Sequence, residues 1–254
     1  MTKRAILLSD GNTASEHSRL AGILDFFGVS WETAQAATFW DLHHEDQNAV
    51  VFGSVRAVSA VLAPAQNADS SLAQNLTFYA YAGADRRESE RALQTLTGSD
   101  DIFLREAPNR TLSLAVSRDH PELTGPMGGL EIPSQLRRED SILVGGLNAK
   151  LALTPVIAAD GAPVFVRFQV NAVAIFLNAS SHLLDIDQAV GPAYYDVKEH
   201  FCSVVPLVMF IRHVFRDSAW QPQELGACLI IDDPLLKQRY GSCDFRTLRD
   251  LMHR

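Results

Sequence analysis

Short apolar runs alternate with helix-periodic segments over the first hundred residues, and this alternation limits most strongly what the chain can fold into. The run at residues 4–9 is apolar and ends at a turn signal, residues 10–12. A helix is expected to follow, because apolar side chains then recur at the helical period at Leu20, Ile23 and Leu24. Strand, loop and helix in this order open a parallel sheet that helices cover.

The same patterns continue through the rest of the chain. Further strands are expected at residues 31–37, 49–53 and 75–82, and a helix at residues 85–96. In the middle the pattern changes to successive β segments, at residues 111–117, 142–144, 155–159, 163–170 and 172–177. The turn signal Asp160-Gly161 predicts a hairpin there, and residues 196–216 are typical of a long buried helix that Pro206 kinks or divides.

We therefore predict a three-layer α/β fold with a mainly parallel sheet and a β-rich, antiparallel extension. Residues 1–220 are expected to form this α/β domain, since residues 217–225 have the composition of a linker. Residues 221–254 are expected to add a C-terminal strand and helix, from an apolar run at residues 227–231 and a helical period at residues 245–252.

Composition excludes several classes of function. With 47% hydrophobic and 20% charged residues the chain can bury a large core. Its net charge of −8 and the lack of a Lys/Arg stripe argue against binding to nucleic acid or to an anionic membrane. The apolar stretches at the N-terminus and at residues 204–211 are too short for a signal peptide or a membrane span. A cytoplasmic location is expected, whereas the oligomeric state stays open.

An acidic pair near the C-terminus is the most chemical feature of the sequence. Asp232 and Asp233 directly follow the apolar run at residues 227–231. Two adjacent carboxylates at the end of a strand point in different directions, so one can act as a general base while the other binds a metal. The alternative is structural: Asp233 caps the following turn and Asp232 is solvated.

The segment around this pair resembles a known family. Residues 227–237, together with Arg239-Tyr240-Gly241 and Asp244-Phe245, are similar to the opening of bacterial polysaccharide-deacetylase-like proteins, which are carbohydrate esterases built on a distorted (β/α) barrel. The resemblance implies that Asp232 is the catalytic base and that Asp233 binds a divalent metal, usually zinc. It also implies that the region upstream is an α/β domain similar to a class I glutamine amidotransferase or flavodoxin-like domain.

The sequence departs from both families at the residues that carry the chemistry. The deacetylases need a His-x-x-x-His pair downstream of the acidic pair, and only His253 follows Asp233. An amidotransferase needs a cysteine on a sharp Gly-flanked turn, but Cys202 lies within the predicted buried helix. Cys202, Cys228 and Cys243 are widely spaced and form no metal knuckle, so Cys202 and Cys228 are expected to be buried structural thiols.

The leading hypothesis is therefore an accessory, non-catalytic region of a polysaccharide-deacetylase-like protein, with a carbohydrate as a possible ligand and zinc bound only in a full-length protein. The alternative is an amidotransferase-like module that binds a small molecule or a protein without catalysis. Two loops are weaker candidates for binding, and hydrogen-bonded structure is the more ordinary interpretation of both. They are the turn at residues 9–13 and the strand end with Asn178, Ser180, Ser181 and His182.

Overall fold

The computed structural model describes residues 3–11, 14–43, 48–65, 76–136, 140–145, 152–181, 183–187, 197–220 and 249. The chain divides into two units, Met1–Gln221 and Pro222–Arg254. The first unit is described below. The strand expected at residues 227–231, the acidic pair and the helix expected at residues 245–252 lie outside the described residues. The assignment of residues 221–254 to a strand and helix therefore stays a prediction.

A nine-stranded mixed sheet organises the first unit, in the order β2-β1-β3-β4-β11-β10-β9-β6-β7. The parallel half contains β2 (Trp31–Gln35), β1 (Arg4–Ser9), β3 (Ala49–Ser54), β4 (Thr77–Tyr81) and β11 (Val173–Asn178). The antiparallel half continues from β11 through β10 (Ala162–Val170), β9 (Thr154–Ala159), β6 (Thr111–Val116) and β7 (Glu131–Gln135). A separate two-stranded sheet pairs β5 (Ile102–Glu106) with β8 (Ser141–Gly145).

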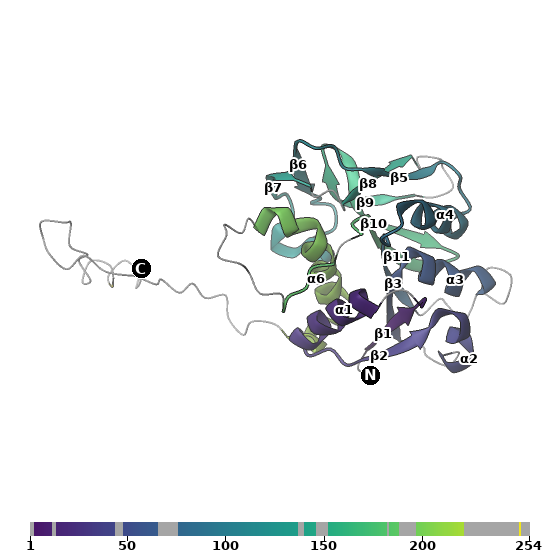
Figure 1. Cartoon of the computed structure of the whole chain (residues 1–254). Coiled ribbons are helices and arrows are strands. Elements are labelled where there is room, and N and C mark those ends of the chain that lie inside the picture. Colours follow the sequence, from purple (N-terminus) through teal and green to yellow (C-terminus); the bar gives the residue numbers. More distant parts are fainter. Residues whose placement is uncertain are drawn as a thin grey trace, which may run out of the picture. The chain divides into compact units, whose positions relative to one another are not determined.

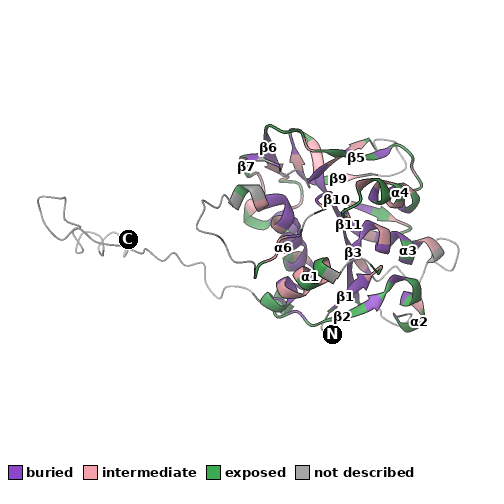
Figure 2. Ribbon diagram, in the orientation of Figure 1, coloured by how far each residue is buried: buried purple, intermediate pink, exposed green. Residues whose placement is uncertain are grey.

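Helices cover both faces of the large sheet, so the fold has three layers (Figure 1). On one face lie α1 (Ala14–Phe26) and α6 (Phe201–Phe215), and on the other lie α3 (Val55–Ala65) and α4 (Arg86–Thr97). Strand β1 shows why: Ala5 and Leu7 enter the core beneath α1 and α6, while Ile6 and Leu8 enter the core beneath α3. Figure 2 shows buried residues along the central strands, whereas β2 at the edge of the sheet is largely exposed.

Short elements complete the unit. Two are single-turn α-helices, α2 (Phe39–His43) and α5 (Pro121–Thr124). Four are 3-10 turns, η1 (Ala36–Thr38), η2 (Gly125–Met127), η3 (Val197–His200) and η4 (Arg216–Ser218). The turn η4 continues directly from α6.

The predicted three-layer α/β fold with an antiparallel extension is confirmed. The hairpin predicted at Asp160-Gly161 joins β9 to β10, and α1 stops before Gly28, which has a φ of +66°. Two strands were not predicted, β5 and β7, because neither shows clear alternation over enough residues. The long helix expected at residues 196–216 is also shorter, since residues Val197–His200 form the turn η3 and α6 begins at Phe201.

Pro206 lies inside α6 rather than at its start, and the structure compensates for it. Proline has no N–H, so the carbonyl of Cys202 four residues earlier lacks its helical donor. The side-chain amide of Asn178, at the end of β11, donates to that carbonyl at 2.9 Å. The same amide nitrogen donates to the hydroxyl of Tyr79 at 3.2 Å. One buried amide thus ties β11 to both β4 and α6.

Candidate functional site

Open parallel sheets usually bind ligands beyond the carboxyl ends of their strands, where the strand order reverses. In this chain the protein's own side chains fill that position. From β1 the chain proceeds to β2 on one side and then to β3 on the other, so the strand order reverses between β1 and β3. The carboxyl ends of these two strands lead to Asp10 and Ser54. Ser54 Oγ donates to Asp10 Oδ2 at 2.9 Å, and Arg56 Nε donates to the same oxygen at 3.0 Å.

Arg56 extends this network to the neighbouring helix. Its second nitrogen donates to the backbone carbonyl of Asp10 at 3.0 Å, and its third donates to Glu88 Oε1 on α4 at 2.7 Å. The Asp10 side chain is only 10% exposed. The guanidinium therefore spans the crevice and joins the β1 loop, the start of α3 and the start of α4.

Ser54 is a helix cap and not a nucleophile. It is the last residue of β3, and α3 begins at the next residue. Its hydroxyl accepts from the backbone N–H of Ala57 at 3.1 Å, the usual contact of a serine N-cap, while its own proton goes to Asp10. The hydroxyl is buried, and both of its bonding functions serve the fold.

Replacing Arg56 with methionine tests this structural role. Methionine keeps much of the apolar stem but removes three hydrogen bonds to two carboxyl-bearing residues, and it leaves the nearly buried Asp10 carboxylate short of donors. We expect the free energy of unfolding to fall by about 1.5 kcal/mol. Urea denaturation measures it. Glu88→Gln is the matched control, with an expected loss below about 0.5 kcal/mol, since the Glu88 side chain is half exposed. Equal losses in both variants would contradict the role assigned to Asp10.

Asn178, Ser180 and Cys202 have structural roles, whereas Ser181 lines a small pocket beyond the carboxyl ends of β4 and β11. Asn178 and Ser180 are fully buried, and Ser180 Oγ donates to Asp140 Oδ1 at 2.6 Å. Cys202 is a buried thiol in the first turn of α6, as expected, and burial raises its pKa well above the ordinary value. It therefore stays protonated and unreactive.

Four candidates cannot be placed, because Asp232, Asp233, His182 and Cys228 lie outside the described residues. The roles of base and metal ligand, and the burial of Cys228, therefore stay predictions. Within the described ranges, no three His, Cys, Asp or Glu side chains gather where they could hold a metal ion. No helix among those ranges is long and apolar enough to cross a membrane.

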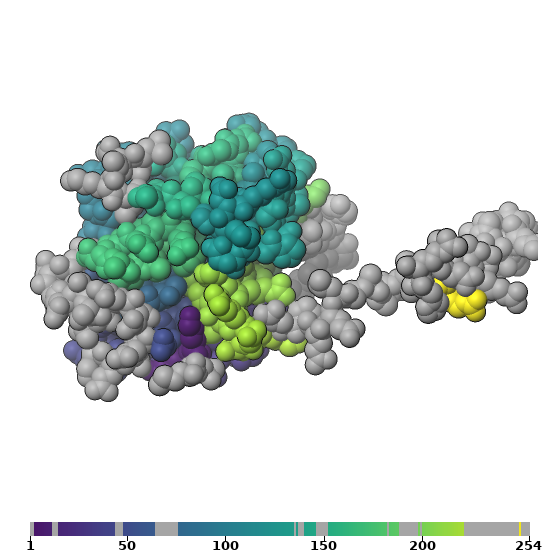
Figure 3. Space-filling view, turned by 180° about the vertical axis from the view of Figure 1, so that it is seen from behind, coloured from purple at the N-terminus to yellow at the C-terminus, as the bar shows by residue number. Residues whose placement is uncertain are grey.

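A pocket of about 560 Å³ lies at the other end of the parallel strands, beside their amino ends. Lys3 directly precedes β1, Thr77 begins β4, and Ala174 is the second residue of β11. The other wall is the end of α6 together with η4. Figure 3 shows the dark purple start of the described chain beside the yellow-green end of α6.

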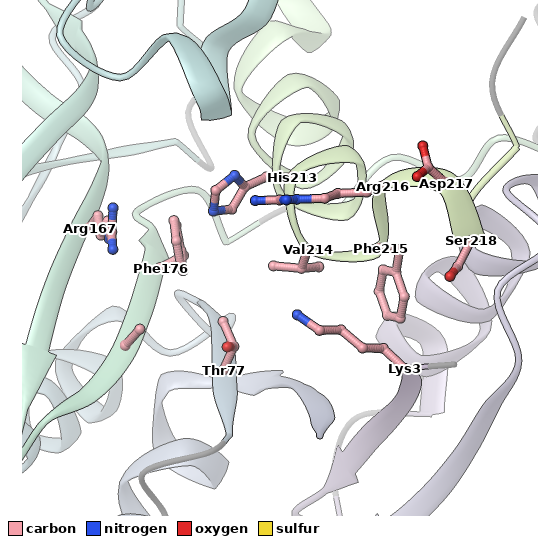
Figure 4. Close-up of a pocket in the computed structure, with 11 residues that line it drawn as sticks. Lys3, Thr77, Arg167, Phe176, His213, Val214, Phe215, Arg216, Asp217 and Ser218 are labelled. Atoms are coloured by element: carbon pink, nitrogen blue, oxygen red, sulfur yellow. The ribbon is translucent and has the colours of Figure 1, made fainter. Parts of the chain in front are cut away.

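Cationic side chains from separate elements converge on this pocket (Figure 4). Lys3 comes from the chain start, Arg167 from β10 and Arg216 from η4, and Asp217 is the one acidic residue among those that line it. The lining therefore carries a formal charge of +2 with His213 neutral, in a chain whose net charge is −8. Cations at the end of a helix complement its dipole, which accounts for Arg216 but not for Lys3 or Arg167.

The ring of Phe176 contacts two of the pocket's nitrogen-bearing side chains. The Arg167 guanidinium lies over the ring of Phe176 at 5.6 Å, and the His213 ring lies 5.8 Å from the same ring. His213 Nδ1 lies 3.1 Å from the backbone carbonyl oxygen of Glu122 on α5. The Glu122 carboxylate is 3.8 Å from Arg167, so it only partly neutralises that guanidinium.

The backbone of Arg216 is strained. Its φ of +45° and ψ of −120° fall in a region that glycine adopts and that costs other residues about 1–3 kcal/mol. This conformation ends α6, with the Arg216 N–H donating to the carbonyl of Arg212. Glycine would adopt this conformation without strain. The presence of arginine therefore indicates that the Arg216 side chain has a function in the pocket.

A second pocket, of about 370 Å³, lies beyond the carboxyl ends of β4 and β11. Its charged residues, Arg86 and Glu106, pair with each other at 2.9 Å. Serine hydroxyls and backbone from Ala82 to Ala84 form much of the rest. Because its charges cancel, it has weaker electrostatic selectivity than the cationic pocket.

Sequence reasoning missed the cationic pocket. One signal was present: Arg167 is the charged residue in strand β10 and interrupts the apolar run at residues 162–168. Lys3, His213 and Arg216 gave no local pattern, because they meet Arg167 only in the folded unit.

Comparisons with known proteins identify no family. No protein-family model and no curated protein match the chain. Among solved structures the chain is similar to a protein described as a GMP synthase subunit from Thermoplasma acidophilum, at 9% identity and a TM-score of 0.47 over 85% of this chain and 96% of that one. It is similar to a cytoplasmic protein from Salmonella typhimurium at 8% identity and a TM-score of 0.46, over 83% and 97% of the two chains.

A third similar structure is an exo-β-1,4-mannosidase from an Opitutaceae bacterium, at 10% identity and a TM-score of 0.43. The match covers 85% of this chain but 35% of the mannosidase. At 8 to 10% identity these likenesses assign no activity. The fold class of this chain is therefore established by its own strand order and layers: a three-layer α/β unit with a mixed sheet.

Proposed function

We propose that the first unit is a binding module for a small molecule with two or more negative charges. The observation that carries the proposal is the convergence of Lys3, Arg167 and Arg216 on one pocket, where Asp217 lines the wall and Glu122 lies 3.8 Å from Arg167. These cations come from three different elements, so no single helix end or turn explains their meeting. A protein with a net charge of −8 gains little from such a cluster unless an anion uses it.

The size and lining of the pocket define the ligand class further. A volume of about 560 Å³ is within the range of pockets that hold metabolites. Arginine binds phosphate and carboxylate oxygens through two parallel N–H groups, and Lys3 adds an ammonium with three donors. Phe176 offers an apolar face beside the charges. The fitting ligand is thus a compact phosphate, sulfate or polycarboxylate group carried on a small body.

This proposal corresponds to a small-molecule-binding module without catalysis. The accessory role in a polysaccharide-deacetylase-like protein stays a separate prediction, because it depends on Asp232 and Asp233. Nothing in the described pocket favours a neutral sugar over an anion. Extending the sequence beyond Arg254 to look for a His-x-x-x-His pair tests the deacetylase prediction independently.

Titration calorimetry with two simple anions tests the binding proposal. Sulfate represents tetrahedral oxyanions and oxalate represents dicarboxylates, and we expect the full chain to bind at least one of them. Arg167→Gln should weaken that binding by about tenfold, because it removes a charged donor that is only partly neutralised by Glu122. Higher salt should weaken binding in the wild-type protein.

The matched control is Arg91→Gln, which removes the same charge from the exposed surface of α4. We expect this variant to bind the anion with the affinity of the wild type. Both variants lose one positive charge, so a difference in affinity between them reports the contact in the pocket and not the net charge. Thermal unfolding of both variants establishes that they are folded. No binding of either anion by the wild type, or equal weakening in the two variants, would overturn the proposal.

A further inference from the structure

His213 is the one side chain in the cationic pocket whose charge can change near neutral pH. Its position is fixed from three sides: by α6, by the ring of Phe176 and by the carbonyl of Glu122. Figure 4 shows the imidazole between Arg167 and the Arg216 side chain, over the pocket. The charge state of this ring therefore bears directly on any anion that enters.

The hydrogen bond to Glu122 determines which ring nitrogen holds the proton. A carbonyl oxygen can only accept, so Nδ1 must carry the hydrogen that it donates across 3.1 Å. In the neutral ring Nε2 then has a lone pair and no hydrogen. A lone pair repels an anionic oxygen, so the neutral ring cannot contribute a hydrogen bond to the proposed ligand from Nε2.

Charged groups near the ring set its protonation when no ligand is bound. Glu122 on α5 lies against Nδ1, Arg167 on β10 shares the Phe176 ring, and Arg216, Asp217 and Lys3 line the same pocket. Burial lowers the pKa of His213 below its ordinary value, and the charges of Arg167 and Arg216 lower it further, against an opposing contribution from Glu122. The ring is therefore neutral at neutral pH in the free protein.

We propose that the pocket takes up one proton together with its anion, and that His213 Nε2 is the atom that receives it. The inference rests on the proposed anion-binding function and adds its regulation. A bound anion supplies the negative charge that offsets Arg167 and Arg216 and an acceptor for the new N–H. The proton comes from solvent, so the balance is one anion and one proton bound per site.

The sign of the pH dependence follows from linkage. The complex holds more protons than the free protein wherever the free ring is neutral and the bound ring is charged. In that window affinity rises as pH falls, by up to about tenfold per pH unit. The window begins below the ordinary pKa of histidine, where the free ring itself takes up a proton, and extends upward to the raised pKa of the complex.

Calorimetry in paired buffers measures the proton directly. Sulfate and oxalate keep a constant charge between about pH 6 and about pH 8, so any proton exchanged belongs to the protein or the buffer. Binding to the full chain at about pH 7, in two buffers of different ionisation enthalpy, is expected to show uptake of about one proton per anion. The dissociation constant should also fall as pH decreases across that range.

His213→Gln is the variant that assigns the proton. Glutamine keeps a neutral amide that can donate to Glu122 but cannot titrate. Its complex should show no proton uptake and a nearly constant affinity across the same pH range. Proton NMR gives a second readout. The histidine resonance of the wild type that is absent from the variant should titrate at a higher pH when the anion is present.

The outcomes separate the two proposals. Anion binding by the wild type without proton uptake overturns this inference and leaves the binding module intact. Proton uptake that persists in His213→Gln overturns the assignment to Nε2. No binding of either anion by the wild type overturns the binding module and this inference together.

Discussion

Replacing Phe210 with alanine is expected to lower the free energy of unfolding by about 4 kcal/mol. Phe210 on α6 is fully buried, and its ring lies 5.5 Å from Phe52, 5.1 Å from Tyr79 and 5.0 Å from Phe176, centroid to centroid. These partners belong to β3, β4 and β11, so the ring fills the space between the helix and three parallel strands. Truncation leaves a cavity that such a rigid sheet cannot close.

Chemical denaturation followed by circular dichroism measures this loss. Phe103→Ala is the matched control, because Phe103 on β5 is 46% exposed and its truncation should cost less than about 1 kcal/mol. Phe210→Leu provides a folded intermediate case with a smaller loss. A cost for Phe210→Ala no larger than that of the control would show that α6 is not anchored through this ring. Because α6 also carries His213, weaker anion binding should accompany the instability.

Substituting Arg216 with glycine is expected to change stability and binding in opposite directions. Glycine adopts the observed φ of +45° without strain, whereas arginine does so at a cost. The same change removes a guanidinium from the proposed anion pocket. Affinity for sulfate or oxalate should fall by about thirtyfold, the equivalent of one charge-assisted contact.

Arg216→Ala separates the two effects, because it removes the guanidinium but keeps a Cβ in the strained conformation. We expect the glycine variant to be more stable than the alanine variant by about 1 kcal/mol, after the larger chain entropy of unfolded glycine is subtracted. Both variants should bind anions equally poorly in calorimetry. If alanine proves as stable as glycine, the backbone of Arg216 is not strained. If either variant binds as the wild type does, Arg216 is not part of the site.

The parts of the fold that follow from local chemistry could be predicted from the sequence. The β9–β10 hairpin is one example: Asp160 and Gly161 have φ values of +46° and +81°, as the turn requires. Helix α4 is another, since Asp85 accepts from the N–H of Glu88 at its start and Gly98 ends it with a φ of +63°. In both cases the signal lies within a few residues of the structure that it determines.

Strands β5 and β7 could not be predicted because their local signals are weak. In β5 only Ile102 and Leu104 are buried, and the strand ends in Arg105 and Glu106. In β7 a proline, Pro133, interrupts the pattern, as sheet edges tolerate. These strands exist because a partner strand is placed beside them, which is a property of the tertiary structure.

The candidate site was missed for a related reason. The acidic pair Asp232-Asp233 attracted the prediction because both residues stand together in a recognisable segment. The cationic pocket has no such segment: Lys3, Arg167 and Arg216 are brought together by the crossover that places β11 beside β4 and by the return of α6 across the sheet. Periodicity shows which side of an element is buried, but it does not show which distant elements meet.

The position of β11 has a consequence for how the chain acquires its structure. This strand separates the parallel half from the antiparallel half, yet it comes after β10 in the chain and pairs with β4 across a long intervening stretch. Pairing at such sequence separation is slow to form. Until residue 178 has been synthesised, the apolar residues Phe78, Tyr79, Ala80 and Tyr81 stand at an open sheet margin. An unpaired strand margin can pair with another chain, so slow docking of β11 favours self-association while the unit folds.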